Sequence, residues 1–592
     1  MSFVLKQPFN RSITASHNLT FSILLSAARS TSRVLSQSNS KVSFFQRLMT
    51  AKMSHHAFDT SGNNDPVWIH KEPYSNRPKF SKLSKDLQTE VCVIGSGIAG
   101  ISTAYELVNR GIEVVMIEAR DVISGESGRT SGHLSSALDA SYDEIASKHG
   151  SSGAKAAAES HVWATKRVGE ISKQLGIECE YRTLPDYEIS QYERGNPKHH
   201  EEMEMLQNDM NKAKELGLPV HYAEGYAIKG WDGKPDQRDA VVYGEQATFH
   251  PTKYLVGVLK WLAQQPNFSC YTHTRMMSIE ERGLLSKEVH ISTLDGQTIT
   301  CKNAVEATCI PLQKLSIVAQ LEYLRTYCIA IRVPKGSIED CLINDQAEPY
   351  RYIRFTDCDA NDDYLVIGGG DHKVGQENEE GRFAELETWV RERFTKAGSV
   401  DYKWSGQILE SVDQVSLVGL NQGKSRTYVV TGDTGHGLTL GVLAGKLIAD
   451  EIQGIDNAWG KLYNPKRLPP VSSLPSMLTH DMQINAQYKR FLQSDITDIE
   501  DLVPGTGGVL NATTKKPVAV YKDEKGKTKQ FSALCPHLKG VVCWNNVEKS
   551  WDCPVHGSRF DKDGICVMGP AKAGLPAMDE AGESTQKQAG VA

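Results

Sequence analysis

The sequence has 592 residues, of which 40% are hydrophobic and 23% are charged, so it is long enough for more than one globular domain. Its formal net charge of −6 gives no indication of nucleic-acid binding or of a polybasic membrane contact. No stretch reaches the roughly 18 uncharged apolar residues that a spanning helix needs. The twelve cysteines are dispersed, which argues against a disulfide framework. We therefore expect neither a nucleic-acid partner nor a membrane span.

The first 58 residues contain no Asp or Glu and are rich in serine and basic residues, which is typical of a mitochondrial transit peptide. A secretory signal with residues 19–28 as its apolar core is an alternative, but basic residues continue beyond that core. Translation from Met49 or Met53 would instead give a cytoplasmic product without the leader. We predict a mitochondrial protein with a targeting peptide at 1–58 and an extended lead-in at 59–88.

The next stretch, residues 90–118, has the pattern of a dinucleotide-binding unit. An apolar strand at 91–94 ends in Gly-Ser-Gly-Ile-Ala-Gly, a helical pattern follows, and a second apolar strand at 114–117 ends in Glu118. The first glycine of the loop allows a tight turn, the second lets the backbone approach a pyrophosphate, and the third lets the helix pack closely on the strand. Glu118 stands where a carboxylate can accept hydrogen bonds from a ribose hydroxyl.

Residues 121–133 (Asp-Val-Ile-Ser-Gly-Glu-Ser-Gly-Arg-Thr-Ser-Gly-His) show which dinucleotide is expected. This segment resembles the one that follows the ribose-binding acid in FAD-dependent amine and amino-acid oxidases of the D-amino-acid oxidase/glycine oxidase superfamily. The resemblance covers about 90–467. It is diffuse in the middle and strong again at 428–440, before an apolar helix at 442–452. It implies a Rossmann-like α/β FAD-binding domain with an antiparallel-sheet substrate domain, together spanning 89–468. A histidyl linkage to FAD at His133 is an open alternative to non-covalent binding.

The resemblance also implies the FAD contacts, including Met276 in a predicted strand at 274–279 and Ala307 where the chain passes the flavin again. The helix after 428–440 would point its N-terminus at the isoalloxazine and favour negative charge there. The implied contacts are Gly95, Gly97, Ile98, Ala99, Gly100, Glu118, Ala119, Ser127, Gly128, Arg129, Thr130, Met276, Ala307, Gly432, Gly435, His436, Gly437 and Thr439.

The middle of the chain is expected to be helical at 154–175, 197–216 and 252–264, and rich in strands at 326–333, 350–355 and 364–370. In the superfamily such strands form the antiparallel sheet that roofs the flavin. Polar residues of this roof are candidate substrate contacts, because an arginine there would hold a carboxylate in a bidentate pair. Alternating Tyr and Arg is equally typical of one solvent-exposed strand face. The catalytic candidates are Arg351, Tyr352, Arg354 and His372, with Tyr323, Arg325 and Tyr350 as further roof residues.

Proline-rich sequence at 469–475 predicts a linker at 469–500, followed by a small all-β domain at 501–578 and a disordered tail at 579–592. Two short motifs lie in this domain, Cys535-Pro-His537 and Cys553-Pro-Val-His556, with 15 residues between them. One cysteine and one histidine from each loop suit a [2Fe–2S] cluster in which two thiolates hold one iron and two imidazoles the other. The alternative is a Cys₂His₂ zinc site, which more often pairs like residues within one motif.

The flanking segments 551–560 and 569–571 resemble the second loop and the proline loop of Rieske domains. Val555 stands where respiratory members carry a disulfide-forming cysteine. The resemblance therefore implies a disulfide-free, ferredoxin-type Rieske domain, with Cys535, His537, Cys553 and His556 as ligands and a potential toward the low end of the Rieske range.

Together these features predict an FAD-dependent enzyme that dehydrogenates a small amine or amino acid. Electrons would pass through the Rieske cluster to a one-electron acceptor protein or a quinone-like acceptor. An NAD(P)H-dependent reductase is an alternative, although residues 368–370 lack the spacing of a second dinucleotide loop. A non-enzymatic redox sensor is another. A Rieske oxygenase is disfavoured, because no two-histidine, one-carboxylate pattern for mononuclear iron stands out. Substrate, acceptor and oligomeric state are left open.

Overall fold

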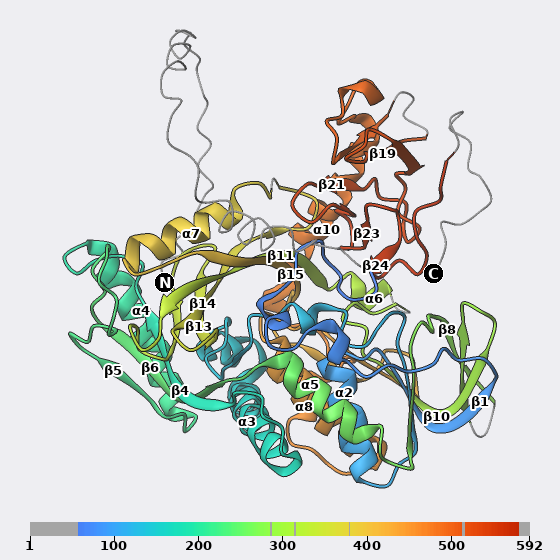
Figure 1. Ribbon diagram of the computed structural model, residues 1–592. Helices are drawn as coiled ribbons and strands as arrows, with labels where there is room; N and C mark the ends of the chain where they lie inside the picture. The colour runs from blue at the N-terminus through green and yellow to red at the C-terminus, as the bar shows by residue number, and fades with distance from the viewer. Residues whose placement is uncertain (1–56, 284–286, 313–314, 378, 512–515, 579–592) are drawn as a thin grey trace, which may run out of the picture. The chain divides into compact units, whose positions relative to one another are not determined.

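The computed structural model describes residues 57–283, 287–312, 315–377, 379–511 and 516–578 (Figure 1). The predicted targeting peptide, apart from its last two residues, and the predicted tail at 579–592 lie outside these ranges. Within the described ranges, no helix combines the length and the apolar character needed to cross a membrane.

The predicted dinucleotide unit forms as a parallel βαβ motif: β1 (Leu87–Ile94), α2 (Ile98–Asn109) and β2 (Val114–Ile117). The last four residues of β1 and all of β2 are buried, as expected for strands covered on both faces. They belong to an eight-stranded sheet of the order β16-β17-β10-β1-β2-β7, to which β9 and β8 add an antiparallel extension. Its other strands are β7 (Phe268–Tyr271), β8 (Met276–Arg282), β9 (Glu288–Thr293), β10 (Thr298–Glu306), β16 (Leu417–Leu420) and β17 (Thr427–Thr431).

Helix α2 packs against α8 (Gly437–Ile452) and α5 (Pro251–Leu262), as Figure 1 shows. Close approach of α2 and α8 depends on glycine. A Cβ at Gly441 would lie 2.5 Å from the Ile98 side chain, and one at Gly445 would lie 2.7 Å from the Ser102 backbone. This packing sets the N-terminus of α8 near the glycine loop.

The predicted antiparallel roof is present as a second, nine-stranded sheet of the order β15-β11-β14-β13-β12-β4-β6-β3, with β5 paired to β6. Its pairs are antiparallel except β4 with β12. Helix α7 (Arg382–Arg393) packs on β11 and β14 through buried Leu386, Trp389 and Val390. The strands are β3 (His133–Leu134), β4 (Arg182–Ile189), β5 (Val220–Ala223), β6 (Ala240–Thr248), β11 (Leu321–Pro334), β12 (Leu342–Asp345), β13 (Arg351–Asp357), β14 (Asp362–Lys373) and β15 (Val400–Ser411).

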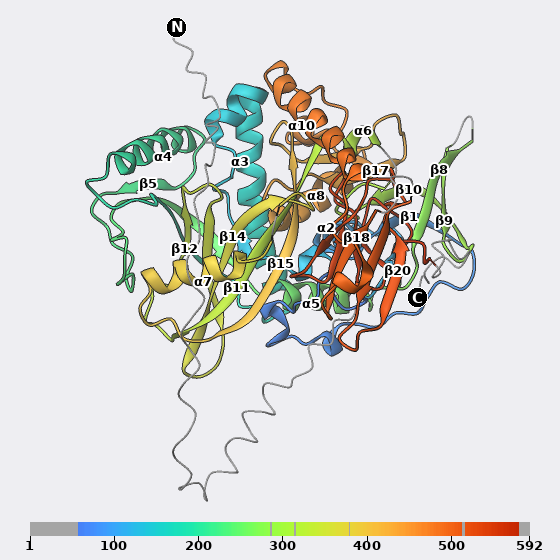
Figure 2. The same ribbon diagram turned by 90° about the horizontal axis from the view of Figure 1, so that it is seen from above.

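The C-terminal region is a small all-β domain, drawn in orange to red in Figures 1 and 2. One antiparallel sheet joins β18 (Thr506–Leu510), β19 (Val518–Lys522) and β20 (Thr528–Ser532). A second joins β21 (Cys543–Asn545), β22 (Ser550–Asp552), β23 (Arg559–Asp561) and β24 (Cys566–Met568). Buried Trp551 and Phe560 lie in the core of this domain. The mixed α/β architecture and the small β-domain confirm the predicted fold class.

The predicted linker at 469–500 contains a helix, α10 (Leu474–Ala486), followed by η5 (Gln487–Leu492). Proline predicted a break here, but Pro475 lies in the first helical turn, where no intrahelical partner is needed for the missing N–H. Ile484 of α10 and Tyr488 of η5 pack on the core of the β-domain. The remaining helices are η1 (Val67–Ile69), η2 (Tyr74–Asn76), η3 (Glu126–Gly128), α3 (Tyr142–Leu175), α4 (Pro197–Glu215), α6 (Leu315–Val318), α9 (Gly460–Tyr463), η4 (Val471–Ser473) and η6 (Ile499–Asp501).

Candidate active site and metal centre

A cavity of about 1170 Å³ extends from the glycine loop to the antiparallel sheet. All but three of the residues predicted for FAD contact line it. The exceptions are Gly100, Gly128 and Thr439, and each has a role in packing. A Cβ at Gly100 would lie 1.9 Å from the Gly95 carbonyl oxygen, and one at Gly128 would lie 2.6 Å from that of Ile123. The Thr439 hydroxyl donates to the His436 carbonyl oxygen at 3.1 Å.

The N-termini of two helices face this cavity, and neither helix is capped by the side chain of its own N-cap residue. Helix α2 begins after Gly97 and α8 begins after His436, and the residues at both starts line the cavity. Free backbone N–H groups and the helix dipole make such ends suitable for anions. A pyrophosphate at α2 and an electron-rich ring at α8 fit this donor set, so the cavity suits a dinucleotide.

The Glu118 carboxylate holds the glycine loop in shape. Its Oε2 accepts hydrogen bonds from the backbone N and the Oγ of Ser96, at 2.9 and 2.8 Å, and its Oε1 accepts from the Arg120 N at 3.1 Å. Glu118 also lines the cavity, so it can reach a ribose hydroxyl from this position. Opposite it, Ser127 Oγ accepts from the Ile98 backbone N at 3.0 Å. The ribose-binding role of Glu118 stays a prediction that this geometry fits.

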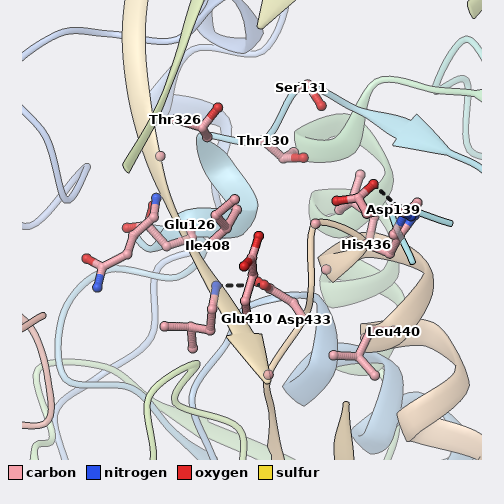
Figure 3. Close-up of a pocket in the computed structure, with 18 of the residues that line it drawn as sticks. Glu126, Thr130, Ser131, Asp139, Thr326, Ile408, Glu410, Asp433, His436 and Leu440 are labelled. Atoms are coloured by element: carbon pink, nitrogen blue, oxygen red, sulfur yellow. Dashed lines mark hydrogen bonds and ion pairs between the residues drawn. The ribbon is translucent and has the colours of Figure 1, made fainter. Parts of the chain in front are cut away.

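Beneath the antiparallel sheet, Asp139 lies between His436 and Tyr350 (Figure 3 shows Asp139 and His436). Its Oδ1 is 3.0 Å from His436 Nε2, and its Oδ2 accepts from the Tyr350 hydroxyl at 3.0 Å. Burial lowers the pKa of His436, but the negative charge of Asp139 outweighs it, so the pKa is raised from its usual value. This group is a candidate site for holding a proton near a bound substrate.

Further carboxylates line the same side of the cavity. Glu410 and Asp433 lie beside each other in Figure 3, and Asp433 Oδ1 accepts from the Leu409 N at 2.8 Å. Burial raises the pKa of Asp371, Glu410 and Asp433 to about 7 in each case. Asp433 lies within the 428–440 segment that the sequence analysis singled out, and Asp371 directly follows a predicted strand, but neither was predicted as a site residue. Glu410 belongs to no motif that the sequence analysis identified.

Of the four predicted catalytic residues, only Tyr352 lines the cavity. The Arg354 guanidinium is fully buried and donates to the carbonyl oxygens of Gly132, Phe249 and Phe355. Arg351 lies 3.8 Å from Asp345. His372 is stacked on Tyr327 and bonded to its hydroxyl at 2.9 Å. The alternation of Tyr and Arg in β13 could not reveal that the Arg354 guanidinium donates to backbone carbonyl oxygens.

The other predicted residues of the antiparallel sheet lie in two places. Tyr350 lines the cavity, whereas Tyr323 and Arg325 face the β-domain.

The four predicted cluster ligands come together as two like pairs. The Cys535 and Cys553 thiols are hydrogen-bonded to each other, and this bond lowers the pKa of Cys535 to about 7. The His537 and His556 rings are 5.1 Å apart between centroids, and His556 Nδ1 is buried without a partner. Backbone N–H groups of both loops point at the sulfurs. Within the described ranges, no three His, Cys, Asp or Glu side chains converge on one metal ion. Two thiols beside two imidazoles fit a two-iron Rieske cluster.

The β-domain contacts the flavin domain through its second ligand loop. The Gly557 carbonyl oxygen accepts from Gln407 Nε2 at 3.1 Å, and the Tyr323 ring lies 6.2 Å from the His556 ring. Gly557 has a φ of +69°, and a Cβ there would lie 2.7 Å from the Tyr323 ring. Val567, Met568, Gly569 and Ala571 of the β-domain line the large cavity itself.

A buried ion pair links the same two domains. Arg129, itself a predicted FAD contact, has its Nη2 3.0 Å from Glu548 Oε1, so its guanidinium serves the contact between the domains. Both side chains are almost fully buried, as is Arg325, whose Nη2 lies 3.8 Å from the same oxygen.

The family model of FAD dependent oxidoreductases matches residues 90–451, and that of the Rieske [2Fe-2S] domain matches residues 495–579. The Bacillus subtilis protein YhfW, named as a Rieske 2Fe-2S iron-sulfur protein, is 27% identical over 85% of this chain and 96% of its own length. Gamma-glutamylputrescine oxidoreductase of Escherichia coli is 23% identical over 63% of this chain and 86% of its own length.

Solved structures agree with this fold. Glycine oxidase from Geobacillus kaustophilus superposes with a TM-score of 0.53 at 17% identity, covering 64% of this chain and 99% of that one. L-amino acid deaminase from Proteus vulgaris gives 0.52 at 18% identity, covering 66% and 97%. The chain belongs to the FAD-dependent oxidoreductase family and carries a C-terminal Rieske [2Fe–2S] domain.

Proposed function

We propose that this oxidoreductase dehydrogenates a small amine or amino acid and delivers the electrons, through its Rieske cluster, to a one-electron acceptor protein. FAD held by the glycine loop and Glu118 would supply a two-electron acceptor for the hydride on the carbon next to the amine nitrogen, and the nitrogen would release a proton as the C=N bond forms. A [2Fe–2S] cluster carries electrons one at a time, so the two electrons of each turnover leave in separate steps.

The position of Gln407 carries this proposal. Gln407 lines the cavity, and its side-chain amide donates to Gly557 in the loop that holds Cys553 and His556. Its backbone N also donates to Glu126 at 2.6 Å, and Glu126 lines the cavity as well. A single residue therefore spans the distance between the predicted flavin site and the cluster loop. Such direct contact supports electron transfer within the chain.

The side chains on the substrate side of the cavity would orient the amine. Tyr350 and Tyr352 provide aromatic walls, with ring centroids 5.7 Å apart. The Asp139–His436 pair can take up or return a proton at His436 Nε2. The uncapped N-terminus of α8 favours negative charge at the adjoining end of the cavity. The name of the Escherichia coli relative, a gamma-glutamylputrescine oxidoreductase, supports an amine substrate.

An anaerobic screen tests the proposal. Purified holoenzyme is mixed with secondary amines, amino acids, polyamines, NADH or NADPH, and bleaching of the oxidised flavin absorbance is followed. We expect an amine or amino acid to bleach the flavin, with reduction of the cluster to follow. Rapid bleaching by NADH with every amine inactive would contradict the proposal and favour a nicotinamide-dependent reductase.

A further inference from the structure

Carboxylates far outnumber cationic side chains on the substrate side of the cavity, where His436, paired with Asp139, supplies positive charge. Six of these acids are Asp139, Asp186, Glu188, Asp371, Glu410 and Asp433. No lysine lines the cavity in the part of the chain that the structure describes, and its arginines are Arg120, Arg129 and Arg275. These three lie in segments at the dinucleotide end and bond elsewhere, to Ala57, Glu548 and Cys566 respectively. The chamber is therefore acidic without an arginine to hold a carboxylate.

The hydrogen bonds inside the chamber come mainly from neutral donors. Asn344 Nδ2 donates to both Asp186 and Glu188, at 2.8 and 3.0 Å. Asp345 also lines the cavity and is only 3% exposed, but its Oδ1 accepts from the backbone N of Ala347 and of Arg351, and its Oδ2 has the Arg351 guanidinium as an ion-pair partner at 3.8 Å. The Oδ1 of Asp371 is buried without a hydrogen-bond donor. A buried carboxylate oxygen without a partner is costly unless a ligand supplies one.

Burial, together with neighbouring carboxylates, raises the pKa values of acids in the chamber. Burial raises the pKa of Asp186 to about 6, and burial and the charge of Asp186 together raise that of Glu188. A metal ion is an unsuitable counter-charge, because no three of these acids converge on one point within the described ranges. The acids are spread along the chamber instead, and Tyr350 and Tyr352 add aromatic faces that attract organic cations.

We propose that the substrate is an aliphatic amine with at least one further cationic nitrogen and without a carboxylate beside the reacting carbon, that is, a diamine or polyamine. This inference rests on the proposed function and narrows it from amines and amino acids to one class. One nitrogen is neutral when its neighbouring carbon loses hydride, as in any such dehydrogenation. The remaining ammonium group stays charged and pairs with the acids of the chamber. An amino-acid carboxylate would meet the same acids and be repelled.

Three probes with the same carbon chain test this proposal on the holoenzyme. Putrescine carries a second ammonium group, butylamine carries none, and γ-aminobutyrate carries a carboxylate in its place. We expect the second-order rate constant for anaerobic flavin reduction to be at least about tenfold higher for putrescine than for butylamine, because putrescine makes one additional charge-assisted contact. γ-Aminobutyrate should be slower still. Equal rates, or a preference for γ-aminobutyrate, would overturn the proposal.

Glu410→Gln removes one chamber charge with little change in shape. The ratio of kcat/KM for putrescine to that for butylamine should fall several-fold in this variant, because KM for putrescine rises while kcat changes little. Glu500→Gln serves as the control, because Glu500 lies on the surface of the β-domain with its side chain 88% exposed. An unchanged ratio in Glu410→Gln would contradict the proposal that the acids of the chamber bind the second ammonium group.

A binding measurement separates this inference from the proposed function. Ligand binding perturbs the absorbance of oxidised flavin without any turnover. If putrescine binds more tightly than γ-aminobutyrate but no amine reduces the flavin, the acidic chamber is supported and the dehydrogenase function fails. If amino acids reduce the flavin while putrescine neither binds nor reduces it, the function survives and the substrate class is wrong.

Discussion

Replacing Glu548 by Gln should detach the Rieske domain from the flavin domain. The carboxylate is fully buried and accepts from Arg129 at 3.0 Å, the Ser405 backbone N at 3.1 Å and the Asn63 backbone N at 2.6 Å. It thus connects three parts of the chain: the β-domain, the β15 strand and the segment before β1. Burial tends to raise the pKa of Glu548, but the nearby arginines lower it to about 2, so the group is ionised in any ordinary buffer.

The amide that Glu548→Gln introduces would keep the shape of the side chain but leave two buried guanidinium groups, of Arg129 and Arg325, without their negative partner. Removing one member of a buried ion pair costs about 3–5 kcal/mol. The cost falls on the domain contact, so the population of undocked Rieske domain should rise by more than about a hundredfold. Because the folded pKa is depressed, the stabilisation is complete above a pH of about 4.5 and is lost as the pH falls toward 2.

Limited proteolysis in the 469–500 segment measures undocking, and gel filtration of the cut protein shows whether the Rieske domain stays bound. Flavin fluorescence reports FAD release in parallel, because the β-domain lines the FAD cavity through Met568 and its neighbours. We expect Glu548→Gln to be cut faster and to release FAD, whereas Glu500→Gln behaves like the wild type. Wild-type cleavage and FAD retention in Glu548→Gln would refute the reasoning.

Three further outcomes follow from the structure. Glu118→Ala should weaken FAD retention by about 1–3 kcal/mol, and by more than Ser96→Ala, which removes a hydroxyl bonded to Glu118 but leaves the carboxylate in the cavity; equal FAD affinities of the two variants by fluorescence titration would contradict this. The KM for putrescine should fall between pH 6 and pH 8, because Asp371 and Glu410, with pKa values near 7, become negative as the pH rises; a flat profile would count against it. Residues 1–58 fused to a fluorescent protein should localise to mitochondria by microscopy, and a diffuse cytosolic signal would show otherwise.

The dinucleotide loop and the cluster motifs could be predicted from the sequence, because their chemistry requires particular residues at short, fixed spacing. Gly95 and Gly97 and the two Cys-Pro motifs are signals of this kind. The acidic chamber could not be predicted, since Asp139, Asp186 and Glu410 come from distant segments that only the folded sheet brings together. Strand alternation likewise cannot separate Tyr352, which lines the cavity, from Arg354, which is buried against backbone carbonyls.

Pro475 shows the same limit for local structure. Proline predicts a break in a sequence pattern, but it is also compatible with the first turn of a helix, and the side chains that favour α10 pack on a domain that lies later in the chain.

The proposed exit of electrons from the flavin through the Rieske cluster can be tested with the variant His556→Ala. The best amine from the anaerobic screen is mixed with wild type and variant, and flavin absorbance, the cluster's electron paramagnetic resonance signal and turnover with a one-electron acceptor are recorded. We predict that the variant loses the cluster signal, keeps flavin reduction by the amine, and loses most turnover with the acceptor. Wild-type turnover with the acceptor in the absence of the cluster would contradict the account.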